Sequence, residues 1–114
     1  MIKPTAVDAY FADLNKDGRF EAELVEGTLE DDHDVDASWT SSVWDDGVPV
    51  TKMFHRNGKV RLHLPAGTKL RGVRYVGQAS GCDMFDFVYG LSWFSLSEGD
   101  AQEIIDDLCY SPPV

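Results

Sequence analysis

Turn-forming residues divide the middle of this chain into apolar-rich segments of a length that suits strands better than helices. Between residues 37 and 76 they occur at three places, which are Asp45-Asp46-Gly47, Asn57-Gly58 and Pro65-Ala66-Gly67. The Asn57-Gly58 pair is typical of a two-residue hairpin turn, because both residues tolerate a positive φ. The spacing therefore predicts a β-meander of four short segments across residues 37–76.

Helical periodicity occurs near the two ends of the chain. Residues 4–14 predict a short amphipathic helix from the spacing of Val7, Tyr10, Phe11 and Leu14. A second helix is predicted after Ser97, a suitable N-cap, with Glu98 and Asp100 in its first turn. Its apolar stripe consists of Ala101, Ile104, Ile105 and Leu108. Both helices therefore have one face that must pack on something else.

Two further segments have strand character. From Arg19 to Leu24 apolar and polar residues alternate, which predicts a half-buried strand with an acidic outer face. Residues 83–96 form the most apolar stretch, and Gly90 interrupts it where a central hairpin would turn. The chain is therefore predicted to be one α+β domain, residues 1–114, with a short N-terminal helix and a C-terminal helix packed on a small antiparallel β-sheet or meander.

The charges are strongly segregated along the chain. Residues 1–46 contain 13 acidic and three basic residues, residues 47–82 contain seven basic residues and no acid, and residues 83–114 contain seven acids and no base. The net charge of −10 argues against direct binding to a nucleic-acid backbone, which depends on a surplus of Lys and Arg. A basic centre lies between two acidic flanks.

The acidic run of residues 26–36 is predicted to be a solvated loop, because it has little apolar content. Closely spaced carboxylates can imitate the phosphates of a nucleic acid and bind in a basic groove. Trp39 and Trp44 lie close by, and an exposed Trp is a frequent interface residue. The predicted partner-binding residues are Glu26, Glu30, Asp31, Asp32, Asp34, Asp36, Trp39, Trp44, Asp45 and Asp46.

The predicted hairpin around Asn57-Gly58 carries bases on one face around Phe54. They are Lys52, Arg56, Lys59, Arg61 and His63. Cations interleaved with an aromatic residue could form a nucleic-acid platform. The favoured alternative is neutralisation within the chain by Glu21 and Glu23, or by the carboxylates of the last helix, because the protein has an acidic surplus.

A calcium-binding module is a second functional hypothesis. Asp13, Asn15 and Asp17, followed by Gly18 and Glu21, have the spacing of the first half of an EF-hand loop. The twelfth position of that loop, which needs a bidentate carboxylate, is Leu24. A turn that ends the first helix explains the same residues.

A small cysteine- or histidine-dependent enzyme is a third hypothesis, with Cys82 as nucleophile and His55 or His63 as base. No spacing between these residues supports it. Cys82 and Cys109 suit a pair of thiols in a reducing compartment, and a single disulfide bridge between them stays an alternative. No motif implies a cofactor.

The favoured hypothesis is a non-enzymatic, acidic protein-binding antagonist of the inhibitor or immunity type. Phage-encoded anti-defence proteins fit the same profile by analogy of composition. The expected partner is another protein that is basic or handles nucleic acid. No apolar run is long enough to cross a membrane and no secretory signal is apparent, so we expect a cytoplasmic protein. The sequence leaves the oligomeric state open.

Overall fold

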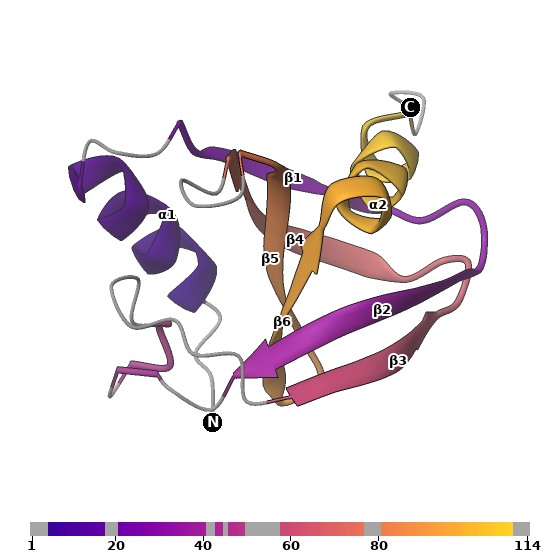
Figure 1. Ribbon diagram of the computed structural model, residues 1–114, viewed down its shortest axis with the longest axis horizontal. Coiled ribbons are helices and arrows are strands. Elements are labelled where there is room, and N and C mark those ends of the chain that lie inside the picture. Colours follow the sequence, from indigo (N-terminus) through magenta and orange to yellow (C-terminus); the bar gives the residue numbers. More distant parts are fainter. Residues whose placement is uncertain are drawn as a thin grey trace.

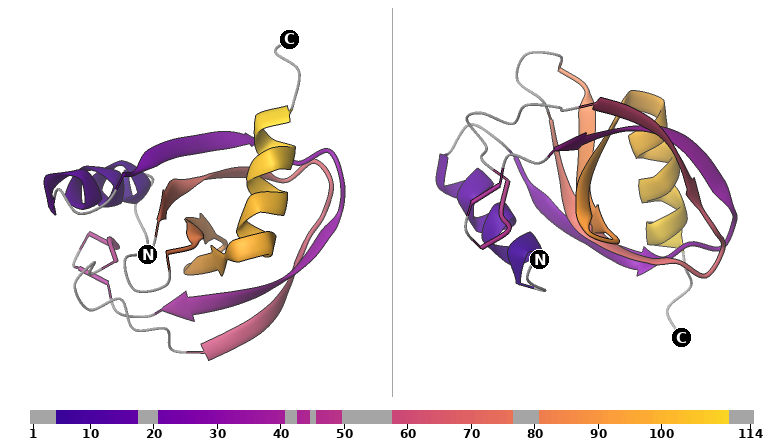
Figure 2. Two further views of the ribbon diagram at one scale, coloured as in Figure 1. Left: turned by 45° about the horizontal axis from the view of Figure 1, so that its top comes forward. Right: turned by 90° about the horizontal axis from the view of Figure 1, so that it is seen from below.

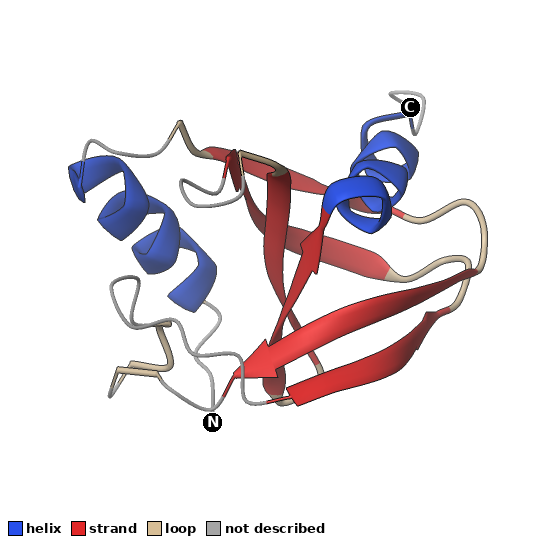
Figure 3. Cartoon of the chain, viewed as in Figure 1, coloured by secondary structure: helices blue, strands red, loops and turns tan. Residues whose placement is uncertain are grey.

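The computed structural model describes residues 5–17, 21–40, 43–44, 46–49, 58–76 and 81–110. Its elements are α1 (Ala6–Asp17), β1 (Glu23–Thr28), β2 (His33–Thr40), β3 (Gly58–Leu64), β4 (Lys69–Val76), β5 (Asp83–Tyr89), β6 (Ser92–Ser97) and α2 (Glu98–Tyr110). The strands form one antiparallel sheet in the order β1-β4-β5-β6-β2-β3, with a helix at each end of the chain (Figures 1 and 3). The predicted α+β class is confirmed.

β1 to β4 form one long two-stranded ribbon, made of the β1–β4 pair and the β2–β3 pair. Glu23 lies opposite Arg74 in the β1–β4 pair, Trp39 lies opposite Gly58 in the β2–β3 pair, and both pairs share a single register. At the bend between them, the Leu29 amide donates to the Thr68 carbonyl at 2.9 Å, which keeps that register. β1 with β2, and β3 with β4, are therefore two long bent strands that curl around α2 (Figure 2).

The predicted meander across residues 37–76 is wrong in its strand order. β3 and β4 follow one another in sequence but are not neighbours in the sheet, because residues 65–68 form a corner and not a hairpin turn. Gly67 has a φ of 87°, and the Thr68 hydroxyl donates to the Pro65 carbonyl at 2.6 Å. In the part of the chain that the structure describes, β3 pairs with β2, and its predicted partner strand falls in residues 50–57, outside that part.

The predicted solvated loop over residues 26–36 is also wrong, because most of this acidic run belongs to strands. Glu26 lies in β1, and Asp34 and Asp36 lie in β2, where they alternate with the buried Val35 and Ala37. The physical reason is strand periodicity, which places every second residue in the core and leaves acids on the other face. Only residues 29–32 connect the two strands.

The predicted strand over residues 19–24 is displaced along the chain. β1 begins at Glu23, and within it Val25 is buried whereas Leu24 is 37% exposed. Residues 18–20 lie outside the described part of the chain. The buried face of β1 therefore carries Val25, and not Leu24 as the alternation over residues 19–24 predicts.

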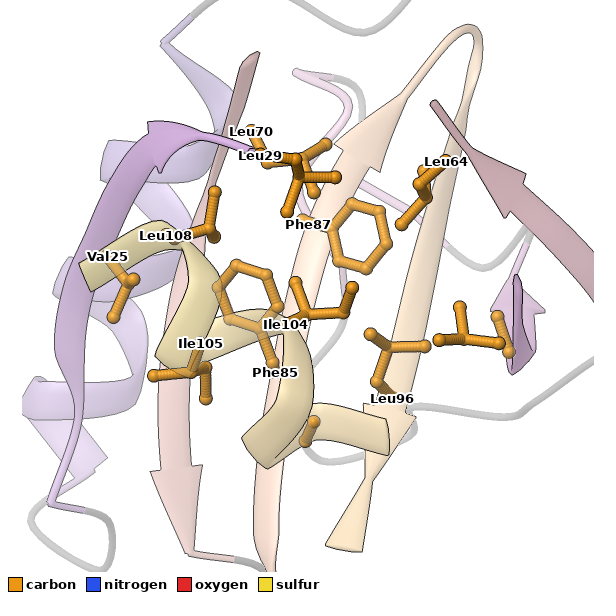
Figure 4. Packing of buried hydrophobic residues seen from close by; sticks show 13 residues of the cluster. Val25, Leu29, Leu64, Leu70, Phe85, Phe87, Leu96, Ile104, Ile105 and Leu108 are labelled. Atoms are coloured by element: carbon orange, nitrogen blue, oxygen red, sulfur yellow. The ribbon is translucent and has the colours of Figure 1, made fainter. Parts of the chain in front are cut away.

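The main core lies between the sheet and α2. The predicted stripe of α2 is buried there against β1, β2, β5 and β6, together with Phe85, Phe87 and Leu96 (Figure 4). The helix lies very close to β1, since a Cβ added at Gly27 would lie 2.5 Å from the Leu108 carbonyl oxygen. The predicted hairpin of residues 83–96 is confirmed, with Gly90 in its turn at a φ of 64°.

A second core lies on the opposite face of the sheet, beneath α1. Tyr10 packs edge-on against Trp93, and its hydroxyl donates to the buried carboxylate of Asp86 at 2.5 Å. Tyr75 donates to the same oxygen at 2.7 Å. Burial and the charge of Asp86 raise the pKa of Tyr10 well above its ordinary value. This polar contact therefore connects α1 to β4 and β5.

The first helix is longer than predicted, since it runs through residue 17 and not only to residue 14. Neither α1 nor α2 has the length and apolar character needed to cross a membrane.

Candidate functional site

The outer face of β2 and β3 pairs acids with bases, and we call it the charge ladder. It comprises the facing pairs Asp34–His63, Asp36–Arg61 and Ser38–Lys59. The Asp34 carboxylate lies 2.7 Å from His63 Nδ1, and Arg61 donates to Asp36 at 3.1 Å. Arg61 thus neutralises Asp36 across neighbouring strands, and His63 lies in hydrogen-bond contact with Asp34.

The arginines of β4 are also paired. Arg71 contacts Asp8 of α1 through both terminal nitrogens and lies 3.3 Å from Glu26. Arg74 contacts Glu23 at 2.8 Å and Asp83 at 3.3 Å. These bonds raise the pKa of both guanidinium groups above its ordinary value, against the opposing effect of burial.

These pairs correct the expected source of neutralisation only in part, because Asp100 of the last helix does lie near enough to help raise the pKa of Arg61. The favoured prediction used Glu21, Glu23 or the last helix against the basic hairpin face. Glu23 pairs with Arg74 of β4 instead, and β2 supplies the carboxylates opposite Arg61 and His63. Lys52, Phe54 and Arg56 lie outside the described residues.

A different surface keeps its negative charge, and we call it the acidic face. It is formed by residues 29–32 between β1 and β2, which we call the corner, and by the outer side of α2. Its exposed carboxylates belong to Glu30, Asp31, Glu103 and Asp106, and Asp107 lies beneath them. Neither the corner nor α2 contains a Lys or Arg. Apart from His33, no cation neutralises this face within the described residues.

Asp107 connects the two parts of the acidic face. Its carboxylate accepts the Glu30 amide at 3.0 Å and the Asp31 amide at 3.3 Å. It also lies 2.6 Å from Nε2 of His33, and both side chains are about nine-tenths buried. Burial raises the pKa of Asp107, but hydrogen bonds from His33 and the two amides outweigh it, so that the pKa is lowered overall.

His33 occupies the centre of this arrangement. Its Nδ1 lies 3.3 Å from Glu103, so that each ring nitrogen faces a carboxylate of α2. Burial lowers the pKa of His33, but the hydrogen bonds with Asp107 and Glu103 outweigh this effect and raise it above 6.5. Even when protonated, this ring carries one positive charge against two carboxylates, so the face stays negative.

The predicted partner-binding residues are spread over several surfaces. Of the ten, Glu30 and Asp31 lie on the acidic face, and Asp32 beside them accepts the Ala66 amide at 2.6 Å. The three acids of the strands are committed to intramolecular pairs, namely Glu26, Asp34 and Asp36.

The remaining predicted residues do not join this cluster in the described part. Trp39 is 36% exposed at the end of β2, and Trp44 is 41% exposed. Trp44 lies close in sequence to Gly47, whose carbonyl accepts a hydrogen bond from the Trp93 indole. Asp46 is exposed, and Asp45 lies outside the described residues.

The prediction from sequence missed Glu103, Asp106 and Asp107. The signal was present, because residues three and four apart lie on one side of a helix. Glu103 and Asp106 lie on the exposed side of α2, and Asp107 lies beside them with a side chain that is 9% exposed. What the sequence could not indicate is that the corner, 70 residues earlier, lies against them.

The calcium hypothesis requires residues 13–17 to begin a metal-binding loop, but these residues are helical. α1 continues through residue 17, and on a helix residues 13 and 15 are separated by about 200°, so their side chains do not converge. Glu21 is exposed. Within the described residues, no three His, Cys, Asp or Glu side chains gather around a point where a metal could bind.

The enzyme hypothesis gains no support from the described residues. Cys82 is half-buried, with Sγ 3.9 Å from Met84 Sδ. His63 belongs to β3 and faces Asp34, and two strands, β6 and β2, lie between β3 and β5, which Cys82 precedes. His55 and the side chain of Cys109 are outside the described part, so the proposed role of His55 and the two alternatives for the cysteines, free thiols or a bridge, stay untested.

One small cavity, of about 130 Å³, opens between β2, β3, β6 and the start of α2. Its lining combines Lys59 with Asp36, Asp100 and the hydroxyls of Ser38, Ser95 and Ser97. Because both charges are present, the lining does not favour one ligand class.

No known family model, no curated protein and no solved structure matches this chain.

Proposed function

We propose that this protein is a non-enzymatic antagonist that binds a basic or nucleic-acid-handling protein through the acidic face. The observation that carries the proposal is the contrast in pairing: Asp34 and Asp36 of the charge ladder contact His63 and Arg61, whereas no Lys or Arg among the described residues pairs with Glu30, Asp31, Glu103 or Asp106. We expect it to act in the cytoplasm.

The proposed binding mode is electrostatic. Four exposed carboxylates on one surface, backed by a fifth, attract a cationic groove and raise the association rate, and this effect falls as salt increases. The acids are also held in place, because Asp107 fixes the corner against α2. A fixed set of charges loses less entropy on binding than carboxylates of a flexible loop would.

The proposal changes the weight of the predicted site residues. Glu30 and Asp31 keep their proposed role, and Glu103 and Asp106 are added to it. The paired acids Asp34 and Asp36 would have to leave their bases before they could bind a partner, which makes them weaker candidates. Trp39 and Trp44 are 36% and 41% exposed but lie away from the acidic face, so they are not part of the proposed interface.

The test is an affinity pull-down from lysate of the source cells at low and high salt, with captured proteins and nucleic acids identified separately. We compare wild type with the triple variant Glu30→Gln, Asp31→Asn, Asp106→Asn. The matched control, Glu21→Gln, Asp34→Asn, Asp36→Asn, removes the same charge outside the acidic face.

We expect a protein captured by wild type and the control at low salt, and lost from the triple variant. Equal capture by both variants would contradict the acidic face as the binding surface. Capture of nucleic acid alone would contradict the antagonist proposal itself.

A further inference from the structure

We infer that His33 is a pH-sensitive latch that holds the corner against α2 while its imidazole is protonated and loosens this contact when the proton is lost. The inference rests on the contacts of one side chain with α2, and it does not depend on the proposed function.

The geometry suits a doubly protonated ring. Asp107 Oδ2 lies 2.6 Å from Nε2, and Glu103 Oε1 lies 3.3 Å from Nδ1. An ionised carboxylate only accepts hydrogen bonds, so both contacts are hydrogen bonds only when both ring nitrogens carry a proton. A neutral imidazole has one N–H, and its other nitrogen then directs a lone pair at a carboxylate. Deprotonation therefore breaks one of the two contacts and removes the charge that strengthens the other.

The two carboxylates differ in their freedom to respond. Glu103 is 58% exposed and can rotate into water, whereas Asp107 is 9% exposed and is held by the corner amides. The neutral ring therefore keeps its proton on Nε2, toward Asp107, and releases Glu103. The bond that remains to Asp107 joins a neutral donor to an anion, so the corner loses part of its attachment.

No other charged group compensates in the described surroundings of His33. From α2, the groups that face the ring are Glu103 and Asp107. In the corner, Glu30 and Asp31 contribute their amides to Asp107, and Asp32 contributes its carboxylate to the Ala66 amide. On β3, the residue opposite His33 is the uncharged and buried Leu64. The titration is thus local to the corner and α2.

The latch also alters the charge of the acidic face. Loss of the His33 proton removes the single positive charge among these carboxylates. Above its pKa the face is both more negative and less firmly held to α2. Below it, the corner and helix form one fixed surface.

The experiment is a solution NMR titration of the full chain from pH 5 to pH 9. It follows the His33 ring protons and the amides of Glu30 and Asp31. The variant Asp107→Asn removes one carboxylate, and His63→Gln is the matched control, because that histidine also faces an aspartate but on the charge ladder.

We expect His33 to titrate with a midpoint above 6.5, and the two corner amides to shift with the same midpoint. Asp107→Asn should lower that midpoint by about one pKa unit, since an adjacent opposite charge commonly shifts a pKa by that much or more. His63→Gln should leave it unchanged. If the corner amides shift independently of His33, or if its midpoint lies at or below 6.5, the latch is excluded.

If Asp107→Asn does not fold, Glu103→Gln gives the same test through the weaker contact. A smaller drop in the midpoint is then expected. An unchanged midpoint would contradict the sharing of the ring between two carboxylates.

Discussion

The charge ladder and the acidic face both contain acids from residues 26–36. The acids of the ladder lie opposite basic residues on a neighbouring strand, whereas those of the acidic face do not. Asp34 and Asp36 lie in β2, where Asp36 forms an ion pair with Arg61 and Asp34 contacts His63. The amides of Glu30 and Asp31, a few residues earlier, donate to Asp107 of α2, and no Lys or Arg among the described residues pairs with their carboxylates. Strand pairing, and not the density of charge along the chain, decides which carboxylates remain available.

The two regions also differ in what holds them. The ladder pairs are exposed on both sides, so water and salt weaken them. The acidic face is fixed by Asp107, a nearly buried carboxylate that accepts from two backbone amides and a histidine. The carboxylates that remain available for binding therefore lie on the acidic face, which is held more firmly than the ladder.

The largest effect should come from removing the carboxylate beneath the acidic face. Asp107→Ala leaves two corner amides and a nearly buried His33 without their acceptor, and should lower the free energy of unfolding by about 3 kcal/mol. Urea denaturation measures it. Asp36→Ala on the ladder is the comparison and should change little. Equal losses for the two variants would contradict the difference between the regions.

A pH-dependent effect should follow in size. Because the folded-state pKa of His33 is raised, its contribution to stability is fully present below pH 6.5 and disappears as the pH rises through the folded value. The pKa of Asp107 is lowered, so its contribution is present above pH 3.8 and is lost as the pH falls through the folded value. The contacts are therefore strongest between these limits.

The stability difference between wild type and His33→Gln should decline above that window, by about 1.4 kcal/mol for each unit by which the pKa of His33 is raised. Thermal unfolding across pH 4–9 measures it. A difference that stays constant with pH would show that His33 contributes by packing alone.

Neutralising the acidic face should have a smaller effect of opposite sign. Glu30→Gln, Asp31→Asn, Asp106→Asn removes repulsion between neighbouring carboxylates, so the melting temperature should rise slightly at low salt and converge with wild type at high salt. A fall in the melting temperature would mean that these acids stabilise the fold and are not a surface kept for binding.

The smallest effect is expected on the ladder. The double variant Asp36→Asn, Arg61→Gln should melt within error of wild type at physiological salt, because exposed ion pairs contribute little. Differential scanning calorimetry of the single and double variants provides the cycle. A coupling that persists at high salt would indicate that the ladder is more than a neutral surface.

Much of the fold followed from local pattern. The stripe of α2, the N-terminal helix and the Gly90 hairpin were predictable because periods of 3.6 and 2 report which side chains must be buried. The strand order was not predictable, because the corners at residues 29–32 and 65–68 contain the same polar and turn-forming residues as hairpins do. The strand pairing distinguishes a bend from a hairpin: β4 lies between β1 and β5, and β2 lies between β6 and β3, so neither β1 with β2 nor β3 with β4 forms a hairpin.

The candidate site was half predictable. Glu30 and Asp31 were identified from their density of charge, but that signal also included Glu26, Asp34 and Asp36, which the fold neutralises. The helix acids were visible as one side of an amphipathic pattern. Their meeting with the corner is a long-range contact between residues more than 70 positions apart, which no local pattern contains.

The measurement that tests the contrast most directly is the surface potential near each region, from NMR relaxation by cationic and neutral paramagnetic probes of equal size. The account predicts that the cationic probe enhances relaxation at Glu30, Asp31, Glu103 and Asp106 well above the neutral probe, and does so much less at Asp34, Asp36 and Arg61. Equal enhancement in the two regions, or a stronger one on the charge ladder, would contradict it.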